Sequence, residues 1–330
     1  MDASAERPTV SVALCTYNGE AFLQEQLDSI AAQTRPPDEL VIGDDCSADS
    51  TIALIERFRA TAPFPVRTIV GPVNVGTTAN FSGTTRATSG DLVFLSDQDD
   101  RWSPHKIERM VAEFRERPAL LALHTNARLV DASGASLGMD LFTAYEVGPD
   151  ELHRLRTGHA FDVLIRRNLA TGATMAVRRE LLQLAMPAPS EWVHDEWLAI
   201  LASALGPATV GVLDEPLIDY RQHDRNQIGA RKLSLRDKIV KASDKPGDFY
   251  TKQLVRTTVL LDRLLSLGPS VTPGQVDRVR DKLAHLRVRE ALPANRAARL
   301  HPIAREWMAG GYRRYSTGMK SLIRDLLHRI

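Results

Sequence analysis

The sequence predicts an α/β fold in which a mostly parallel central sheet carries helices on both faces, followed by a C-terminal α-helical region. Two features predict the sheet. Short apolar runs alternate with segments whose apolar residues recur at helical spacing, and the links between them are short. Both features are typical of repeated βαβ units. A third feature predicts the helical region: from residue 230 onward the chain consists of amphipathic stretches interrupted by Gly and Pro.

The N-terminal part of the chain contains four strand patterns and the helices between them. The first strand pattern is continuously apolar, as in a strand buried on both faces. The helix after it places its apolar residues on one face and ends at Pro36. Ser47 and Asp49 are suitable caps for the next helix. The expected strands are 9–15, 40–42, 66–70 and 91–95, and the expected helices are 22–31, 50–59 and 78–88.

The middle of the chain continues the alternation less regularly. A helix is expected from Pro104 to Arg117, where the amphipathic pattern ends. Residues 131–167 contain scattered Gly, Asp and His and are expected to form a flexible loop region. The remaining expected elements are strands at 120–130 and 172–177, a helix at 194–205, and two short strands near Val210 and Ile218.

Composition places the chain among ordinary globular proteins. It has 330 residues, of which 43% are hydrophobic and 25% are charged. Its two cysteines cannot form a disulfide framework. The first nine residues lack the apolar core of a signal peptide, and no apolar run approaches the ~20 residues of a membrane span. The expected location is therefore the cytoplasm.

Charge is distributed unevenly, although the formal net charge is only +1. Residues 1–229 contain 20 Lys and Arg against 32 Asp and Glu, whereas residues 230–330 contain 22 against nine. Such a split predicts two regions with different roles. We expect a ligand-binding catalytic domain at 1–229 and a basic helical region at 230–330.

An acidic cluster follows the fourth strand, where Asp97, Asp99 and Asp100 occur within four residues. Like charges at this spacing repel, so the cluster needs a positive partner. In a parallel sheet, ligands bind beyond the carboxyl ends of the strands. Two carboxylates there can hold Mg²⁺ or Mn²⁺, which also accepts phosphate oxygens. An acidic helix start before Pro104 is the alternative, but it does not explain Asp97 and Asp99.

Three further stretches offer chemistry at the same edge. Asp44 and Asp45 follow the second strand, where a carboxylate can accept an N–H from a base ring; a plain turn is the alternative. Asp195 begins an apolar helix and is a candidate general base, or else an acidic first turn that complements the helix dipole. Arg221 and His223 follow the last strand as a candidate diphosphate clamp and metal ligand.

Together, six stretches in this order resemble family 2 glycosyltransferases of the Rossmann-like GT-A fold. They are especially similar to the rhamnosyltransferase-like bacterial members that build surface polysaccharides. The stretches are 11–19, 42–47, 74–76, 94–102, 194–195 and 220–223. The resemblance covers about residues 8–230 and implies that 1–229 is a nucleotide-sugar-binding catalytic domain.

The resemblance also implies a role for each matching position. Asp195 is the implied catalytic base, but His194 precedes it and Glu196 follows it, so the choice between Asp195 and Glu196 stays open. Asp45 is expected to bind a uracil or thymine ring, and Arg86 to contact the diphosphate. The implied nucleotide-binding residues are Thr16, Tyr17, Asp44, Asp45, Arg86 and Asp97; the implied metal ligands are Asp99 and His223; the implied diphosphate and sugar contacts are Arg221, Gly172 and Thr174.

The implied reaction is an inverting, metal-dependent sugar transfer from a UDP- or dTDP-linked donor to an acceptor hydroxyl. Mn²⁺ or Mg²⁺ is the implied cofactor, and the acceptor is a glycan, a lipid-linked molecule or a small molecule of surface polysaccharide or glycoconjugate biosynthesis. Two alternatives stay open: a nucleotidyltransferase, and a non-catalytic nucleotide-sugar-binding protein on the same fold. Nucleic acid is not an expected partner, because aromatic residues are sparse and no binding motif is present.

Two basic amphipathic stretches, 233–241 and 312–330, leave the location of the C-terminal region open. One interpretation is peripheral docking on the anionic inner face of the plasma membrane. The other is a helical bundle that packs on the acidic domain while its basic face stays in water. The sequence does not decide between these two interpretations.

Overall fold

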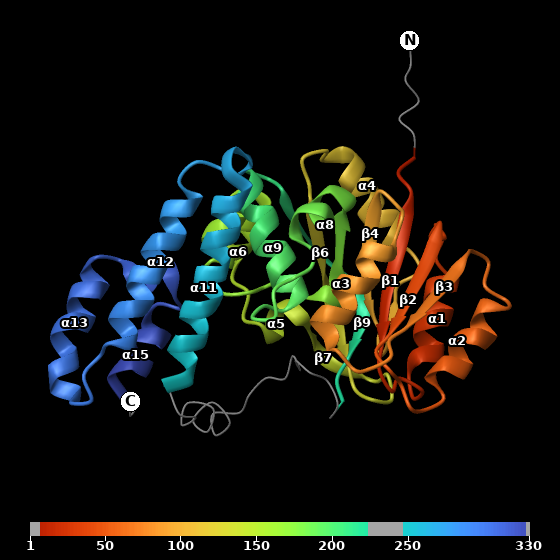
Figure 1. Cartoon of the computed structure of the whole chain (residues 1–330), viewed down its shortest axis with the longest axis horizontal. Coiled ribbons are helices and arrows are strands. Elements are labelled where there is room, and N and C mark those ends of the chain that lie inside the picture. Colours follow the sequence, from red (N-terminus) through yellow and green to blue (C-terminus); the bar gives the residue numbers. More distant parts are fainter. Residues whose placement is uncertain (1–6, 224–246, 328–330) are drawn as a thin grey trace, which may run out of the picture.

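The computed structural model describes residues 7–223 and 247–327 and has the predicted α/β architecture (Figure 1). Within residues 7–223, nine strands form one sheet in the order β3-β2-β1-β4-β8-β6-β9-β5, with β7 paired to β6. The strands are β1 (Val10–Thr16), β2 (Glu39–Asp44), β3 (Val66–Val70), β4 (Leu92–Asp97), β5 (Arg101–Trp102), β6 (Ala122–Val130), β7 (Ser136–Asp140), β8 (Met175–Arg178) and β9 (Val210–Arg221).

The sheet has a parallel half and a mixed half. β3, β2, β1 and β4 run parallel, as the sequence predicts. β8 is antiparallel to both β4 and β6, whereas β9 is parallel to β6 and antiparallel to β5. The carboxyl ends of β1, β2 and β4 therefore meet at one edge, where a parallel sheet binds its ligands.

Helices cover both faces of the sheet. Along β1, Val10, Val12 and Leu14 pack into one buried cluster with α1, α2 and α4. Ala13 and Cys15 face the opposite cluster, which contains α3, α8 and α9, because strand side chains alternate in direction. The helices of this part are α1 (Leu23–Ala31), α2 (Thr51–Arg59), α3 (Thr77–Ala87), α4 (Lys106–Glu116), α5 (Leu141–Ala144), α6 (Pro149–Arg156), α7 (Ala160–Leu164), α8 (Arg179–Ala185) and α9 (His194–Leu205).

Local sequence explains where the helices nearest the ligand-binding edge begin. α3 starts directly after Gly76, whose φ of 84° is a left-handed conformation that suits glycine. α9 carries Asp195 and Glu196 in its first turn, where acidic side chains complement the helix dipole. It ends at Gly206, directly before Pro207.

Three of the expected elements are wrong. Residues 131–167 do not form an open loop, because they contain β7, α5, α6 and α7. Residues Gly172–Thr174 form a 3₁₀ turn, and the strand begins only at Met175. The two short strands expected near Val210 and Ile218 are one strand, β9. β7 depends on pairing with β6, and α5 and α7 are too short to show a helical period, so the local pattern could not reveal them.

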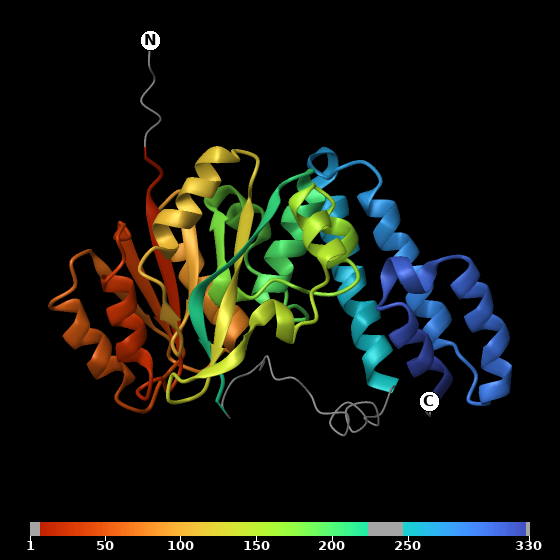
Figure 2. The ribbon, with the colours of Figure 1, turned by 180° about the vertical axis from the view of Figure 1, so that it is seen from behind.

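The C-terminal helices lie at one end of the molecule, beside α9, as both views show (Figures 1 and 2). They are α11 (Gly247–Leu267), the 3₁₀ turn Gly268–Ser270, α12 (Gln275–Glu290), α13 (Arg296–Met308), α14 (Gly311–Tyr315) and α15 (Met319–Leu327). Leu260 and Leu264 of α11 and Val279 of α12 belong to the same buried cluster as Trp197 and Ile200 of α9. Residues 7–223 and these helices therefore share a core.

Two predictions on this region lie outside the described residues: the domain boundary at 229 and the basic stretch 233–241. Across residues 7–223 and 247–327, no helix has the length and apolarity needed to cross a membrane.

Candidate active site

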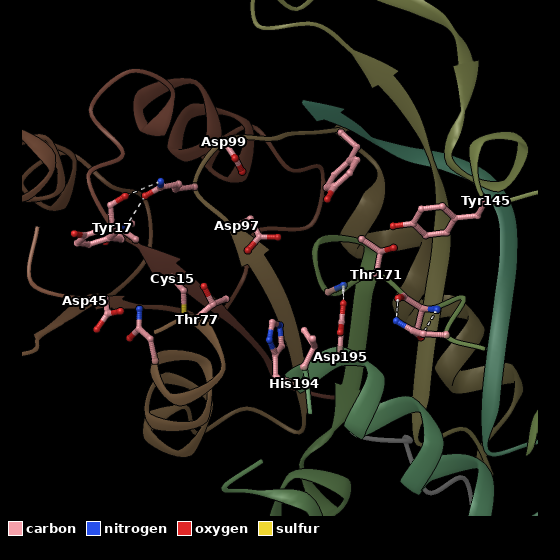
Figure 3. Close-up of a pocket in the computed structure, with 18 residues that line it drawn as sticks. Cys15, Tyr17, Asp45, Thr77, Asp97, Asp99, Tyr145, Thr171, His194 and Asp195 are labelled. Atoms are coloured by element: carbon pink, nitrogen blue, oxygen red, sulfur yellow. Dashed lines mark hydrogen bonds between the residues drawn. The ribbon is translucent and has the colours of Figure 1, made fainter. Parts of the chain in front are cut away.

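A cavity of about 220 Å³ opens at the carboxyl edge of the parallel strands (Figure 3). Its walls come from the ends of β1, β2 and β4, the first turn of α3, the segment before β8 and the first turn of α9. The cavity brings together seven of the predicted site residues: Thr16, Tyr17, Asp45, Asp97, Asp99, Gly172 and Asp195. Segments from distant parts of the sequence therefore converge where a ligand is expected.

The ends of β1 and β2 form one wall of the cavity. Thr16 Oγ1 donates a hydrogen bond to Asp44 Oδ2 at 2.6 Å, and Asp44 also accepts from the N–H and hydroxyl of Ser47. Asp44 is thus a buried brace behind the wall. Asp45 lines the cavity and accepts two consecutive backbone N–H groups of the loop before α3, at 2.7 and 2.8 Å.

Tyr17 lies half-exposed at the cavity rim and is held by Gln98, a residue to which the sequence analysis gave no role. Gln98 Oε1 accepts the backbone N–H of Tyr17 at 2.8 Å, and its amide donates to the Tyr17 carbonyl at 3.0 Å. Gly19 leaves room for this side chain, because a Cβ there would lie 2.2 Å from Gln98 Oε1. The one available signal is the position of Gln98 between Asp97 and Asp99.

An acidic wall comes from the end of β4 and the loop after it. The carboxylates of Asp97, Asp99 and Asp195 face the same space (Figure 3). Burial, followed by repulsion from Asp99 and Asp195, raises the pKa of Asp97 to about 7. Crowded carboxylates of this kind favour a cation between them.

Lys106 supplies part of the positive charge that the acidic cluster needs, and sequence reasoning missed it. It is fully buried at the start of α4 and donates to the Ala173 carbonyl at 2.7 Å. Its ammonium lies 3.8 Å from the ring centroid of Trp102. Burial lowers the pKa of Lys106 to about 7, while Asp100 and Asp97 oppose this shift. Its position just after the acidic motif is the only sequence signal.

Arg221 braces the acidic loop from behind and does not line the cavity, so its expected contact with a diphosphate stays a prediction. Its Nε donates to the Asp99 carbonyl at 2.8 Å, and its backbone N–H donates to Asp100 Oδ1 at 3.0 Å. One Nη pairs with Glu25. With 2% of its surface exposed, the residue is buried behind the cavity wall.

Arg86 and Thr174 also lie outside the cavity. α3 begins at the cavity with Thr77 and runs away from it, so Arg86 in its last turn is exposed about 14 Å further along the helix axis. The expected diphosphate contact of Arg86 stays a prediction. Thr174 is buried, and its hydroxyl donates to the Thr171 carbonyl at 2.8 Å. Thr171, rather than Thr174, lines the cavity.

Asp99 and His223 lie together next to the acidic wall. His223 Nε2 and Asp99 Oδ2 are 2.8 Å apart, and the imidazole stacks on Phe22 with ring centroids separated by 4.9 Å. Carboxylate oxygens are the ligands that Mg²⁺ and Mn²⁺ prefer. Within residues 7–223 and 247–327, no group of three His, Cys, Asp or Glu side chains is arranged to hold a metal by itself. The donor set fits a hard cation that takes further ligands from a bound diphosphate.

Asp195 and Glu196 point to different surroundings, which separates the two candidates for the base. Asp195 lines the cavity, and its Oδ2 accepts the backbone N–H of Gly172 at 2.8 Å. Burial raises the pKa of Asp195 to about 6, although the N–H groups of Gly172 and Glu196 partly offset this. Glu196 instead pairs with Arg256 of α11. Of these two candidates for the base, Asp195 lines the cavity and Glu196 does not.

His194 is a further functional candidate to which the sequence analysis gave no role. It lines the cavity and is buried, and its ring stacks on Phe81 with centroids 3.9 Å apart. Neither ring nitrogen has a hydrogen-bond partner in the described part of the chain. Burial lowers the pKa of His194 to about 3, so the imidazole is neutral at physiological pH. A neutral imidazole offers one donor and one acceptor to a ligand.

The fold resembles solved structures that contain nucleotide sugars. Residues 1–349 of Staphylococcus aureus TarS in complex with UDP-GlcNAc match with a TM-score of 0.58 and 19% identity, covering 84% of this chain and 72% of that one. A mannosyltransferase from Pyrobaculum calidifontis in complex with GDP-Man and Mn²⁺ matches with a TM-score of 0.52 and 19% identity, covering 97% and 86%. At these identities the likeness shows the fold alone, and this fold is that of GT-A glycosyltransferases.

The sequence is also similar to those of other bacterial proteins. The chain is 28% identical over 216 residues to an uncharacterised protein of Mycobacterium tuberculosis, covering 65% of this chain and 59% of the relative. It thus spans about three fifths of that relative's length. It is 24% identical over 257 residues to the dTDP-rhamnosyl transferase RfbG of Shigella flexneri, covering 74% and 82%.

Fold and cavity together place the chain among proteins with the GT-A fold. The model of glycosyl transferase family 2 matches residues 11–182, more than half of the chain, and the chain belongs to this family. Membership of this family favours sugar transfer over nucleotidyl transfer.

Proposed function

We propose that this protein transfers a sugar from a UDP- or dTDP-linked donor to an acceptor hydroxyl, with inversion at the anomeric carbon and with help from Mn²⁺ or Mg²⁺. The product belongs to a surface polysaccharide or another glycoconjugate. The name of the Shigella relative, a dTDP-rhamnosyl transferase, supports a nucleoside-diphosphate deoxysugar as donor. The acceptor is a glycan, a lipid-linked molecule or a small molecule.

The observation that carries this proposal is the position of Asp195 in the cavity. Its carboxylate faces the space between the acidic wall and the 170–172 segment, and the Gly172 N–H fixes one of its oxygens. A general base must hydrogen-bond the hydroxyl whose proton it takes. A pKa near 6 leaves Asp195 ionised at neutral pH and basic enough to accept that proton.

The remaining cavity residues suit a nucleoside-diphosphate sugar. Thr16, Tyr17, Asp45 and Asp97 all line the cavity. We assign the first three to the nucleoside and Asp97 to the ribose and diphosphate. Asp99 and His223 would hold the metal ion, and a divalent cation bound there would offset negative charge on the diphosphate. The neutral imidazole of His194 can hydrogen-bond a sugar hydroxyl in the wall next to Asp195.

The C-terminal helix α15 supports peripheral contact with an anionic membrane. Its exposed face combines Met319, Ile323 and Leu327 with Lys320 and Arg324. Its opposite face packs on the helices, so docking and packing are compatible. Apolar and basic side chains on one surface are what an interfacial helix requires. We propose the cytoplasmic face of the membrane as the place of action.

The proposal is tested by thermal shift with UDP, dTDP and GDP, each with and without Mn²⁺. A ligand that binds only the folded state raises the melting temperature by mass action. We expect one nucleotide to give a metal-dependent shift that Asp99→Ala removes. Arg86→Ala is the matched control, because Arg86 lies at the far end of α3, and it should keep the full shift.

The wild-type protein is then incubated with the corresponding nucleotide sugar, and release of the nucleoside diphosphate is measured. Equal nucleotide shifts in the wild type and in Asp99→Ala would contradict the metal site. No shift with any nucleotide would contradict the proposed donor class.

A further inference from the structure

A second cavity, of about 210 Å³, lies where the catalytic domain meets the C-terminal helices. Its walls come from the 164–168 segment, the first half of α9, and the helices α11 and α12. The indole N–H of Trp192 donates to the Arg256 carbonyl at 3.0 Å and ties α11 to the segment before α9. Both parts of the chain are therefore needed to form this cavity.

The lining of the second cavity is strongly basic. Four cationic side chains line it, Arg166, Arg167, Arg256 and Lys282, against the single carboxylate of Glu196. Arg167 forms an ion pair with Glu151, which does not line the cavity, and donates hydrogen bonds to two backbone carbonyls. The other three cations still outnumber Glu196, so the cavity carries an excess of positive charge.

Among these cations, one buried N–H group has no hydrogen-bond partner in the described residues. Arg256 pairs with Glu196 and lies 4.4 Å above the Trp192 ring, but its buried Nε has no hydrogen-bond partner in the described residues. Lys282 donates to the Ile165 carbonyl, and Arg166 reaches the Ser316 carbonyl only at 3.4 Å. A buried donor without a partner is destabilising, and a bound group that accepts its hydrogen bond would recover this loss.

The positive charge of the lining also favours an anion in the second cavity. Burial lowers the pKa of Lys282 to about 8; Glu196 opposes this shift, whereas Arg256 and Arg289 add to it. Guanidinium groups bind phosphate through paired N–H donors, and lysine adds a point charge. A phosphate group therefore matches this lining better than a neutral ligand.

The second cavity adjoins the active site. Asn168 lines both cavities, and the first turn of α9 separates them, with Asp195 facing one and Glu196 the other. We propose that the second cavity binds a phosphate group of the acceptor and so orients the acceptor hydroxyl toward Asp195. This inference rests on the proposed function, because it needs Asp195 to act as the base.

The test measures the thermal shift given by inorganic phosphate and pyrophosphate in the presence of EDTA, which removes any metal from the active-site cavity. We expect a shift in the wild type that Lys282→Met and Arg256→Gln both abolish. Glu196→Gln should enlarge the shift, because it removes the competing carboxylate. Arg280→Gln is the matched control on α12, since Arg280 is exposed and pairs with Asp277, and it should keep the wild-type shift.

The metal-dependent nucleotide shift, read on the same protein preparations with Mn²⁺ in place of EDTA, separates the two proposals. If the variants keep the nucleotide shift and lose the phosphate shift, they are folded and the phosphate site is supported. If the wild type shows no phosphate shift, or if both Lys282→Met and Arg256→Gln retain it, the phosphate site is refuted while the proposed function stands. If the wild type binds no nucleotide, the acceptor role fails together with the proposed function.

A final comparison identifies the source of the phosphate. Phosphatidylcholine vesicles that carry polyprenyl phosphate are sedimented with the protein, and pure phosphatidylcholine vesicles serve as the reference. Pelleting that needs polyprenyl phosphate and is lost in Lys282→Met indicates a lipid-borne phosphate. A phosphate shift without such pelleting indicates a soluble phosphorylated acceptor.

Discussion

Asp195 and Glu196 are adjacent in the sequence, but their carboxylates have different surroundings. Both lie in the first turn of α9, and the sequence could not choose between them. Successive helical residues point about 100° apart, so one carboxylate enters the cavity and the other meets Arg256. The choice depends on what surrounds the helix, which is a tertiary property.

Asp195→Asn should abolish sugar transfer while nucleotide binding is retained. Loss of a general base typically costs about 10²–10⁴ in rate. The measurement is nucleoside diphosphate release together with the nucleotide thermal shift. Glu180→Gln, which removes an exposed acid from the first turn of α8, should keep full activity. Wild-type turnover in Asp195→Asn would refute its role.

The same substitution should stabilise the folded protein at pH 8. The pKa of Asp195 rises from 3.8 to about 6 on folding, so ionising this group in the folded state costs up to about 3 kcal/mol. The cost is absent below the unfolded pKa, grows as pH rises from about 4 to 6, and is complete above 6. The stability gain of Asp195→Asn, measured by denaturant unfolding, should therefore shrink as pH falls through 6. A gain that is independent of pH would contradict this explanation.

The rate of the wild-type enzyme should fall as pH drops below about 6, because the base becomes protonated. The groups that face Asp195 are Asp97, Tyr145 and the neutral His194. Saturating donor keeps the measurement on turnover rather than on binding. A rate that stays constant down to pH 5 would mean that Asp195 is not the group that accepts the proton.

Sequence reasoning succeeded at single residues where a motif fixes them at the end of a strand. Thr16, Asp45, Asp97 and Asp99 follow strands whose order is simple, so they meet at one edge of the sheet. Arg86 does not line the cavity, and only the direction of α3 reveals that its last turn points away from it.

Buried counter-charges were equally inaccessible to sequence reasoning. Lysine side chains are usually exposed to solvent, but Lys106 is fully buried in the structure. Its partners, the Ala173 carbonyl and the nearby Asp97 and Asp100, come from other elements. No local pattern distinguishes such a lysine from an exposed one.

At the scale of elements, the turn Gly172–Thr174 and the first turn of α9 form the support for the base. A Cβ at Gly172 would lie 2.9 Å from His194 Nε2 and 3.6 Å from Asp195 Oδ2. The His194 ring cannot retreat, because Phe81 stacks behind it. The absence of a side chain at Gly172 therefore allows these two elements to meet.

Gly172→Ala should lower turnover by moving Asp195 and should destabilise the fold by about 1–3 kcal/mol, the usual cost of overpacking. Turnover and the unfolding midpoint are both measured. Gly148→Ala is the matched control, because a Cβ at Gly148 meets nothing within 4 Å and its φ is −86°. Unchanged turnover in Gly172→Ala would show that the support can adapt.

The exposed face of α15 is expected to contact the membrane, and this can be tested by substitution. Ile323→Glu combined with Leu327→Glu should abolish sedimentation with vesicles that contain anionic lipid, since it removes the apolar side chains that would enter the membrane interface. Leu300→Glu, on the exposed surface of α13, is the control and should leave sedimentation intact. A wild-type protein that does not sediment even at low salt would remove the membrane proposal.

At the scale of the whole molecule, the charge boundary does not coincide with a boundary in the core. The sequence predicts two regions from their opposite charge, yet Leu260, Leu264 and Val279 complete the buried cluster around α9. A buried network of Arg289, Asp325, Tyr250 and Tyr312 then links α11, α12, α14 and α15. Composition reports surface charge, and it carries no information on which apolar faces pack together.

A shared core predicts that the described parts unfold as one unit. Leu264 is fully buried, so Leu264→Ala should lower stability by about 2–5 kcal/mol through lost contacts and a new cavity. The neighbouring Leu265 is 50% exposed, and Leu265→Ala should change stability little. Variants that retain only Trp197 or only Trp307 of the four tryptophans report the two sides of the junction separately, because Trp197 lies in α9 and Trp307 in α13. In Leu264→Ala the transition should shift as a whole and remain single. A variant in which Trp307 changes at a lower denaturant concentration, while Trp197 and nucleotide binding persist, would instead show that the C-terminal helices form an independent domain.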